Sequence, residues 1–170
     1  LVAEAWQRRA RGAGGTCFAS INEGREAGAS LRHSHSQLAW LPAPPPAVAS
    51  EHGLPELIEV VERDGLTAGC PVASRVPYEL LIAPVRVEQH GLRSDLLAPA
   101  LRLLAELVRR LQRVRGAGFV PLNAWLHDGP HWHLELFPRT TRLAALELGA
   151  GVYVDAVAPE QAAAELRAAG

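Results

Sequence analysis

The stretch FASINEGREAGASLRHSHSQ, residues 18–37, joins a short apolar run to a loop of small residues and then to two histidines one residue apart. Histidine changes its charge near neutral pH and is the commonest metal ligand in proteins. Small residues such as Gly28 and Ala29 allow a ligand to come close to the backbone. The combination predicts a ligand-binding site between two strands.

The two histidines, His33 and His35, are predicted to lie on one face of a strand together with Gln37, because side chains alternate along a strand. Two imidazoles and an amide on one face could bind a metal ion, or bind and attack a phosphate. A single His-x-His among seven histidines is more often structural. The preceding AGAS loop favours a phosphate site, because its backbone N–H groups and Ser30 could hold an anionic oxygen.

A neutral imidazole suits phosphate chemistry because it attacks phosphorus readily and leaves readily afterwards. It can therefore carry a nucleotidyl group between two acceptors. The attacking nitrogen must be unprotonated, so the other ring nitrogen needs a partner, and a neighbouring backbone carbonyl is the simplest one. Gln37 can donate to a phosphoryl oxygen without competing for protons.

Composition limits the remaining classes of function. The chain has 170 residues, 48% of them hydrophobic, which suits an ordinary globular domain. Its 17 basic and 18 acidic residues give a net charge of -1, so no nucleic-acid partner is expected. No apolar run of membrane-spanning length and no signal peptide is visible, so no membrane partner is expected either.

The two cysteines, Cys17 and Cys70, lie too far apart in sequence for a disulfide framework or a self-contained zinc finger. A reducing cytoplasm is therefore the expected location. The chain begins at Leu1 and contains no methionine, so it was processed or is a piece of a longer protein.

The hydrophobic pattern predicts an α+β fold with a mostly antiparallel sheet. Strands are predicted at residues 16–22, 35–42, 77–84, 118–128, 131–139 and 151–157. Helices are predicted at residues 1–12 with Gly12 as the stop, at 94–116 with Ser94 or Asp95 as the cap, and at 159–169.

Residues 57–71 are predicted to form a hairpin turning at Asp64-Gly65. A helix starting at Leu54 is the alternative for this segment, because Leu57, Val60 and Val61 also fit one helical face.

A helix–strand–strand unit with His-x-His on its last strand occurs twice, which indicates an internal duplication whose first copy lacks its front half. Residues 1–43 are assigned to the first repeat and residues 54–170 to the complete second repeat. The proline-rich residues 44–53 connect them.

The stretch from Phe18 to Gln37 resembles the active-site segment of the galactose-1-phosphate uridylyltransferase family, in the histidine-triad superfamily. That family shows Asn-x-Gly, then A-G-A/C-S, then His-x-His-x-Gln. The HSHSQ form and the trailing LPAPPP are more similar to its ADP-glucose phosphorylase-like branch, and PYELLIAP, HWHLELFPR and PEQAAAELR follow in the family's order. The resemblance covers nearly the whole chain. It implies a histidine-triad-like antiparallel sheet with packed helices, of which this chain is the C-terminal portion.

The resemblance also implies roles for individual residues. His35 corresponds to the nucleophile that becomes the nucleotidyl-histidine, and Gln37 to the residue that holds the transferred phosphate. Asn22 and Ser30 match nucleotide-contacting positions, together with the intervening Gly28 and Ala29.

His33 matches a ligand of a structural zinc ion, whose family partners, a Cys-x-x-Cys pair and an upstream histidine, are not in this sequence. A second divalent metal site is implied at Glu51, His127 and His133, with Glu135 where the family has another histidine. The alternative is that these are polar strand residues, with His131 and His133 flanking Trp132.

The implied reaction is ping-pong transfer between a nucleotide sugar and a sugar 1-phosphate. UDP-glucose–hexose-1-phosphate uridylyltransferase activity in galactose metabolism is the first expectation. ADP-glucose phosphorylase or adenylyltransferase activity, or a truncated non-catalytic remnant that binds a nucleotide or a metal, are the alternatives. The tail lacks the family's hexose-contacting glutamine and tyrosine pattern, so the sugar stays open. The longer protein is expected to be a homodimer, and this chain is expected to leave one sheet edge unpaired.

Overall fold

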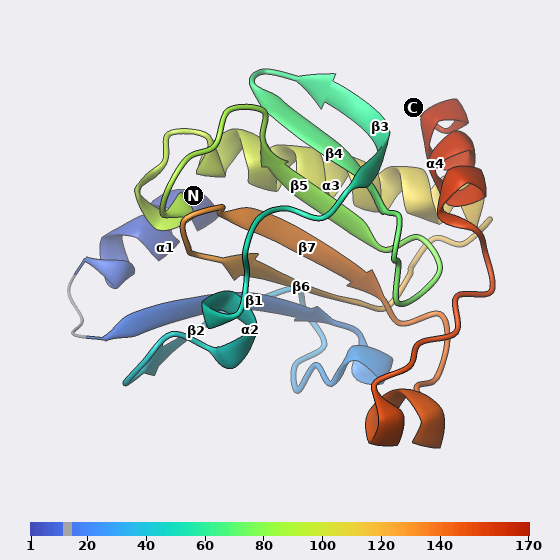
Figure 1. Ribbon diagram of the computed structural model, residues 1–170, viewed down its shortest axis with the longest axis horizontal. Helices are drawn as coiled ribbons and strands as arrows, with labels where there is room; N and C mark the ends of the chain where they lie inside the picture. The colour runs from blue at the N-terminus through green and yellow to red at the C-terminus, as the bar shows by residue number, and fades with distance from the viewer. Residues whose placement is uncertain (12–14) are drawn as a thin grey trace.

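In the computed structural model, which describes residues 1–11 and 15–170, seven strands form one antiparallel sheet in the order β2-β1-β6-β7-β5-β4-β3 (Figure 1). The strands are β1 Thr16–Glu23, β2 Ser36–Leu41, β3 Leu57–Arg63, β4 Leu66–Pro71, β5 Leu80–Pro84, β6 Leu122–His127 and β7 His133–Pro138. The α-helices are α1 Val2–Ala10, α2 Pro46–Ala49, α3 Leu97–Val114 and α4 Pro159–Ala168. The predicted α+β class and antiparallel sheet are confirmed.

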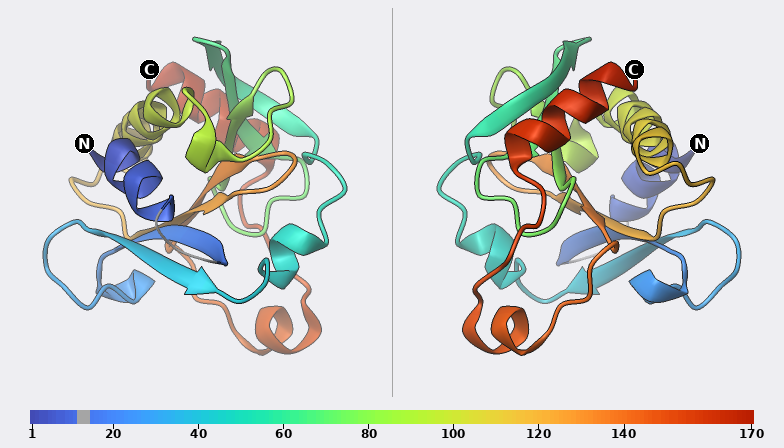
Figure 2. Two further views of the ribbon diagram at one scale, coloured as in Figure 1. Left: turned by 90° about the vertical axis from the view of Figure 1, so that its left-hand side faces the viewer. Right: turned by 90° about the vertical axis from the view of Figure 1, so that its right-hand side faces the viewer.

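The helices are divided between the two faces of the sheet (Figure 2). Helices α1, α3 and α4 cover one face, and the short α2 lies on the other. On β6, Leu122, Ala124 and Leu126 are buried on the side of α3, whereas Asn123 and Trp125 alternate with them and point the other way. We call the face opposite α1, α3 and α4 the open face.

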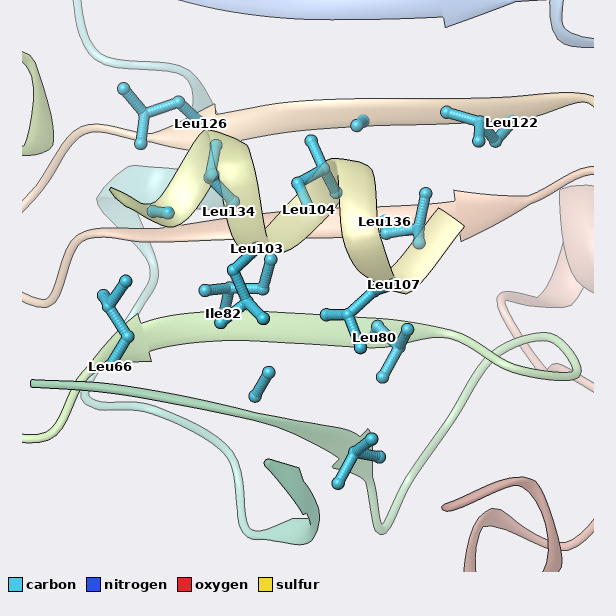
Figure 3. Packing of buried hydrophobic residues seen from close by; sticks show 14 of the residues in the cluster. Leu66, Leu80, Ile82, Leu103, Leu104, Leu107, Leu122, Leu126, Leu134 and Leu136 are labelled. Atoms are coloured by element: carbon cyan, nitrogen blue, oxygen red, sulfur yellow. The ribbon is translucent and has the colours of Figure 1, made fainter. Parts of the chain in front are cut away.

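Helix α3 supplies most of the cover. Its leucines repeat at three- and four-residue spacing, so Leu103, Leu104 and Leu107 all point at the sheet. There they meet Ile82 of β5 and Leu134 of β7 (Figure 3). The amphipathic pattern in the sequence therefore fixes which face of the sheet is closed.

The hairpin predicted at Asp64-Gly65 is confirmed, and the alternative helix from Leu54 is wrong. Both turn residues have positive φ, 53° for Asp64 and 76° for Gly65. Two consecutive residues of this conformation match the twist of the flanking strands, which is why Asp-Gly predicts the turn.

The first predicted repeat joins the second through the pairing of β1 with β6, in which Ile21 lies opposite Ala124. The order β2-β1-β6-β7 is symmetric about this junction, because each inner strand follows a helix and a His-x-His stands at the start of each outer strand. On the second side β7 pairs further with β5, whereas the outer edge of β2 has no strand beside it among the described residues. The assignment of separate repeats at residues 1–43 and 54–170 stays a prediction.

Two local predictions are wrong, the strand at residues 151–157 and the capped start of the helix at residue 94. Residues 151–157 form no strand; a turn of π-helix at Leu146–Ala150 is followed by irregular chain in which Val152 and Val154 are exposed and have no neighbouring strand to pair with. Helix α3 begins at Leu97, with no side-chain cap hydrogen bond at its N-cap. Ser94 instead accepts a hydrogen bond from the N–H of Leu96 before the helix starts.

The remaining differences are small. The predicted connector contains the short helix α2, in keeping with Pro46 at its start. The predicted helix stop, Gly12, lies outside the described residues. Within the part of the chain that the structure describes, no helix combines the length and the apolar character needed to cross a membrane.

Replacing Leu107 by alanine should lower the free energy of unfolding by about 2–5 kcal/mol, because the side chain is fully buried between α3 and the sheet. Urea unfolding measures the change. Arg102→Ala, at an exposed position of the same helix, is the control and should stay within about 0.5 kcal/mol of the wild type. A Leu107→Ala protein as stable as the control would contradict the packing of α3 on the sheet.

Candidate functional site

His35 lies directly before β2, half-buried, with its ring held by the backbone. Its Nδ1 lies 3.0 Å from the carbonyl oxygen of His33, so Nδ1 carries the proton and donates to that oxygen. In the neutral form of this ring, the lone pair is then on Nε2. The expected backbone partner for the ring is confirmed, but the strand begins at Ser36, one residue after His35, rather than including both histidines.

Helix α1 fixes the start of this strand. The indole N–H of the buried Trp6 donates to the hydroxyl of Ser36 at 3.0 Å. Ser36 therefore faces α1, and the next side chain, Gln37, points to the open face. The β1–β2 register pairs Ile21 with Ser36, so its continuation places His35 opposite Asn22.

The loop between β1 and β2 is a compact turn. It contains a single 3₁₀ turn at Arg25–Ala27, ended by Gly28 at φ 78°. A side chain at Gly24 would collide with the ring of Phe119, at 2.9 Å, whereas one at Gly28 would enter open space. The loop is therefore anchored at its beginning and open at the small residues that the sequence singled out.

The sequence suggested that the backbone N–H groups of this loop are available to an anion, but two of them are hydrogen-bonded within the loop. Those of Gly28 and Ala29 donate to the carbonyls of Arg25 and Gly24, at 3.0 Å each. In this conformation an anion at the loop relies on the close approach that the small residues allow and on the exposed Ser30, rather than on these two amides.

Two side-chain amides, those of Asn22 and Asn123, connect the loop to Gln37. Asn22 donates from Nδ2 to the Oε1 of Gln37 at 2.9 Å. Asn123 of β6 donates from its own Nδ2 to the Oδ1 of Asn22 at 2.7 Å and to the carbonyl oxygen of Ala27 at 2.8 Å. The sequence did not point to Asn123, although an asparagine occupies the corresponding inner strand of each half.

A second cluster lies on the open face of β6 and β7. One ligand atom from each of Glu51, His127, His133 and Glu135 lies within 4.8 Å of all the others. The structure therefore brings together the four residues of the predicted second metal site. His127 Nδ1 contacts a carboxylate oxygen of Glu51, and His133 Nε2 lies 3.3 Å from Glu135 Oε1.

The two His-x-His motifs hold their second histidine in the same way. His133 Nδ1 lies 2.9 Å from the carbonyl oxygen of His131, just as His35 Nδ1 lies 3.0 Å from that of His33. In both motifs the Nε2 atom is left for another partner. At His133 that partner is a buried carboxylate, whereas at His35 Nε2 is left for a ligand.

Arg75 is the residue at the second cluster that the sequence did not indicate. Its guanidinium pairs with Glu79 and with the Oε2 atom of Glu135, and lies 5.2 Å from the ring centre of Phe137 and 5.8 Å from that of Trp125. Three carboxylates, those of Glu51, Glu79 and Glu135, therefore gather around one arginine and two histidines.

The electrostatics of the cluster favour its charged form. Burial alone raises the pKa of Glu135, but the hydrogen bond to His133 and the positive charge of Arg75 outweigh it and lower the pKa to about 2. Burial alone lowers the pKa of His133, but the hydrogen bonds to Glu135 and to the carbonyl of His131 outweigh that effect and raise it. Burial opposes the charge of Arg75 as well, but its two carboxylate partners raise the pKa of the guanidinium.

No family model matches the chain. The chain is 29% identical over 176 residues to an ADP-glucose phosphorylase from Arabidopsis thaliana, and the match covers 86% of this chain and 50% of that protein. It is 27% identical to a uridylyltransferase of known structure, with a TM-score of 0.82 over 99% of this chain and 65% of the other. The predicted resemblance to the galactose-1-phosphate uridylyltransferase family is confirmed.

The crystal structure of an ADP-glucose phosphorylase from Arabidopsis thaliana with bound ADP-glucose has the same fold, with a TM-score of 0.85 and 23% identity. That comparison covers 98% of this chain and 64% of the other. The chain spans about half the length of the curated relative that it matches.

The donors of the second cluster fit a divalent cation. Two imidazoles and two carboxylates form a four-ligand set of the kind that zinc accepts. The Oε2 atom of Glu51 is buried and has no hydrogen-bond partner, which a bound cation would compensate. A pocket of about 220 Å³ bordered by Glu51, His133 and Glu135 gives access from solvent.

One contact competes with a cation at this cluster. The indole N–H of Trp125 donates to Nε2 of His127 at 2.9 Å, so a cation there must bind at Nδ1 or displace that hydrogen bond. His33 belongs to no such group: across residues 1–11 and 15–170, the second cluster is the one that could hold a metal ion. Both cysteines are buried free thiols. The zinc site predicted at His33 therefore stays a prediction.

Replacing Glu135 by glutamine should lower the free energy of unfolding of the metal-free protein by an amount that depends on pH. The carboxylate has a pKa of about 2 in the folded protein and 4.5 in its ordinary state, so it stabilises the fold above pH 4.5 and loses this contribution as the pH falls toward 2. At pH 6 we expect the free energy of unfolding of Glu135→Gln to be roughly 2–3 kcal/mol below that of the wild type. This difference should become progressively smaller below pH 4.5.

Urea unfolding between pH 3 and pH 6, in the presence of a chelator, measures the difference. The control is Glu62→Gln on β3, an exposed carboxylate, which should stay within about 0.5 kcal/mol of the wild type throughout. A Glu135→Gln deficit of constant size across this pH range would show that the effect is steric rather than electrostatic.

Proposed function

We propose that the chain carries the nucleophile of a nucleotidyltransferase, with Nε2 of His35 as the attacking atom. The observation that supports this most directly is the ring of His35, whose Nδ1–H is held by the carbonyl of His33 at 3.0 Å. This bond selects the tautomer with an unprotonated Nε2 and keeps the ring oriented. It also stabilises the positive charge that the ring acquires when Nε2 bonds to phosphorus.

The proposed reaction has two displacements at the same phosphorus. In the first, the Nε2 lone pair attacks the α-phosphorus of a nucleotide sugar, and the bond to the bridging oxygen breaks, which releases a sugar 1-phosphate. In the second, an oxygen of an incoming phosphate attacks the nucleotidyl-histidine and the P–N bond breaks, which returns neutral His35. In this proposal Gln37 donates to a phosphoryl oxygen through its Nε2 atom, which the hydrogen bond from Asn22 leaves free, and Asn22, Gly28, Ala29 and Ser30 bind the nucleotide and its phosphates.

ADP-glucose is the first nucleotide sugar to test, ahead of the UDP-glucose expected from the sequence. The relative with 29% identity is an ADP-glucose phosphorylase, for which phosphate is the acceptor. The uridylyltransferase with 27% identity keeps hexose-1-phosphate uridylylation in galactose metabolism as the second candidate.

We further propose that the second cluster binds a divalent cation, with zinc as the first candidate. Glu51, His127, His133 and Glu135 would hold it, and it would supply a structural link between β6, β7 and the segment after α2. His33 is proposed as one ligand of a second, structural zinc ion, whose other ligands this sequence does not contain.

Two further proposals concern the setting of the protein. Homodimer formation is supported by the apolar segment around Leu146–Val154, where Leu148 is 74% and Val154 60% exposed. A cytoplasmic location is supported by the two free thiols, Cys17 and Cys70.

Replacing His35 by alanine should abolish formation of the nucleotidyl-histidine and lower transfer at least about 1,000-fold, because a covalent nucleophile is removed. Intact mass spectrometry after incubation with ADP-glucose or UDP-glucose detects the adduct. The control is Ser34→Ala, at an exposed neighbouring position, which should stay within about threefold of the wild type. Near-normal turnover of His35→Ala would rule out the covalent mechanism, and a wild type that forms no adduct with either sugar nucleotide would favour the non-catalytic remnant.

Replacing His133 by alanine should lower the affinity for one zinc ion at least about 100-fold, because one of four ligands is lost. Titration calorimetry of chelator-treated protein measures the affinity, with manganese as a second cation. His52→Ala is the control, since this exposed histidine follows Glu51 in the chain and is not among the four residues of the cluster. Unchanged zinc binding in His133→Ala would place the metal elsewhere.

A further inference from the structure

The hydrogen bonds of Gln37, Asn22 and Asn123 form a row with a definite direction. The row starts at the carbonyl oxygen of Ala27, passes through Asn123 and Asn22, and ends at Gln37, with donor–acceptor distances of 2.8, 2.7 and 2.9 Å. Each side-chain amide has one end that donates and one that accepts. The order of donors and acceptors along the row is therefore a chemical property of the site.

A single fixed acceptor sets that order. A backbone carbonyl can only accept, so Asn123 must turn its NH₂ group toward Ala27. The same NH₂ group also donates to Asn22, which accepts through its oxygen. Asn22 therefore presents its own NH₂ group to Gln37. Gln37 accepts through Oε1, and its Nε2–H₂ donors are left for a partner outside the row.

We propose that Asn123 is a positioning residue that makes Gln37 a hydrogen-bond donor toward the transferred phosphate. This inference rests on the proposed function of His35. A phosphoryl group offers only acceptors, so Gln37 assists it only when Nε2, and not Oε1, points toward it. Without a fixed neighbour the glutamine amide could present either end.

The residue that sets the polarity comes from the other half of the chain. Asn123 is on β6 and lies directly opposite Asn22 of β1. Both are partly buried, so water does not freely replace the hydrogen bond between them, whereas the bond from Asn22 to Gln37 is exposed. The bond to Ala27 also ties the small-residue loop to the same asparagine, so one side chain aligns the loop and Gln37 together.

Asn123→Asp is the decisive variant, because it changes the polarity with almost no change in shape. Aspartate can only accept, so Asn22 must turn its NH₂ group toward residue 123 and its oxygen toward Gln37. Gln37 then donates to Asn22 and presents Oε1 to the phosphate. We expect the rate of nucleotidyl-histidine formation from ADP-glucose or UDP-glucose to fall about 100- to 1,000-fold, the usual effect of losing one donor to a developing oxyanion.

A double-mutant cycle separates polarity from the added negative charge. If Asn123 acts through Gln37, the Asn123→Asp/Gln37→Ala protein should react no more than about threefold more slowly than Gln37→Ala. Losses that multiply in the double variant would overturn the proposal. Gln89→Glu, an exposed amide-to-acid change of the same net charge, is the matched control and should react like the wild type. Asn123→Ala, which leaves Gln37 free to present either end, should lose about tenfold and serves if the aspartate variant does not fold.

A second readout does not depend on catalysis. In ¹⁵N-labelled wild-type protein, the side-chain amide protons of Asn123 should exchange with solvent more slowly than those of Gln37, because only the former are both hydrogen-bonded within the protein. In Asn123→Asp, one amide proton of Gln37 should become protected. If Gln37 exchange is unchanged, the proposal is wrong even where the enzyme is active. If it is protected in Asn123→Asp but the wild type forms no adduct, the polarity mechanism stands and the proposed reaction fails.

Discussion

The antiparallel pairing of β1 with β6 is the constraint on which the candidate sites depend. It joins residues about one hundred positions apart in the chain and brings Asn22 opposite Asn123. Because side chains alternate along both strands, the same pairing puts Ala19, Ile21 and Ala124 under the helices and turns the asparagines to the open face. A shift of register by one residue would exchange these faces and would bury the polar row in an apolar core.

One backbone arrangement holds a histidine in two different surroundings on this face. In each His-x-His, the second histidine donates from Nδ1 to the carbonyl two residues before it, which frees Nε2. At His133 the free nitrogen meets the carboxylate of Glu135 in a buried cluster, where the carboxylates hold the ring toward its charged form. At His35 the ring is more exposed and has an amide rather than a carboxylate as its neighbour along the strand. The surroundings, rather than the motif, therefore distinguish the proposed nucleophile His35 from the ion-paired His133.

Arg75 explains how Glu135 stays ionised in a buried cluster that holds two further carboxylates. A third buried carboxylate beside Glu51 and Glu79 would repel both in surroundings of low polarity. Arg75 pairs with Glu79 and with one oxygen of Glu135, while the other oxygen of Glu135 faces the histidines. The arginine is also packed beside the rings of Trp125 and Phe137, which fixes the guanidinium in place. Glu135 can thus remain ionised and still offer one oxygen to a cation.

The sequence by itself determined the features that depend on neighbouring residues. The Asp64-Gly65 turn follows from the backbone freedom of two adjacent residues, α3 from the spacing of its leucines, and the held ring of His35 from a carbonyl only two residues away. Only the tertiary structure decided which distant side chains meet. Asn123 and Arg75 stand in segments without a distinctive motif, and their importance arises from strand pairing and from charges contributed by other elements. The failure at residues 151–157 has the same cause, since an alternating apolar pattern becomes a strand only where another strand offers its backbone hydrogen bonds.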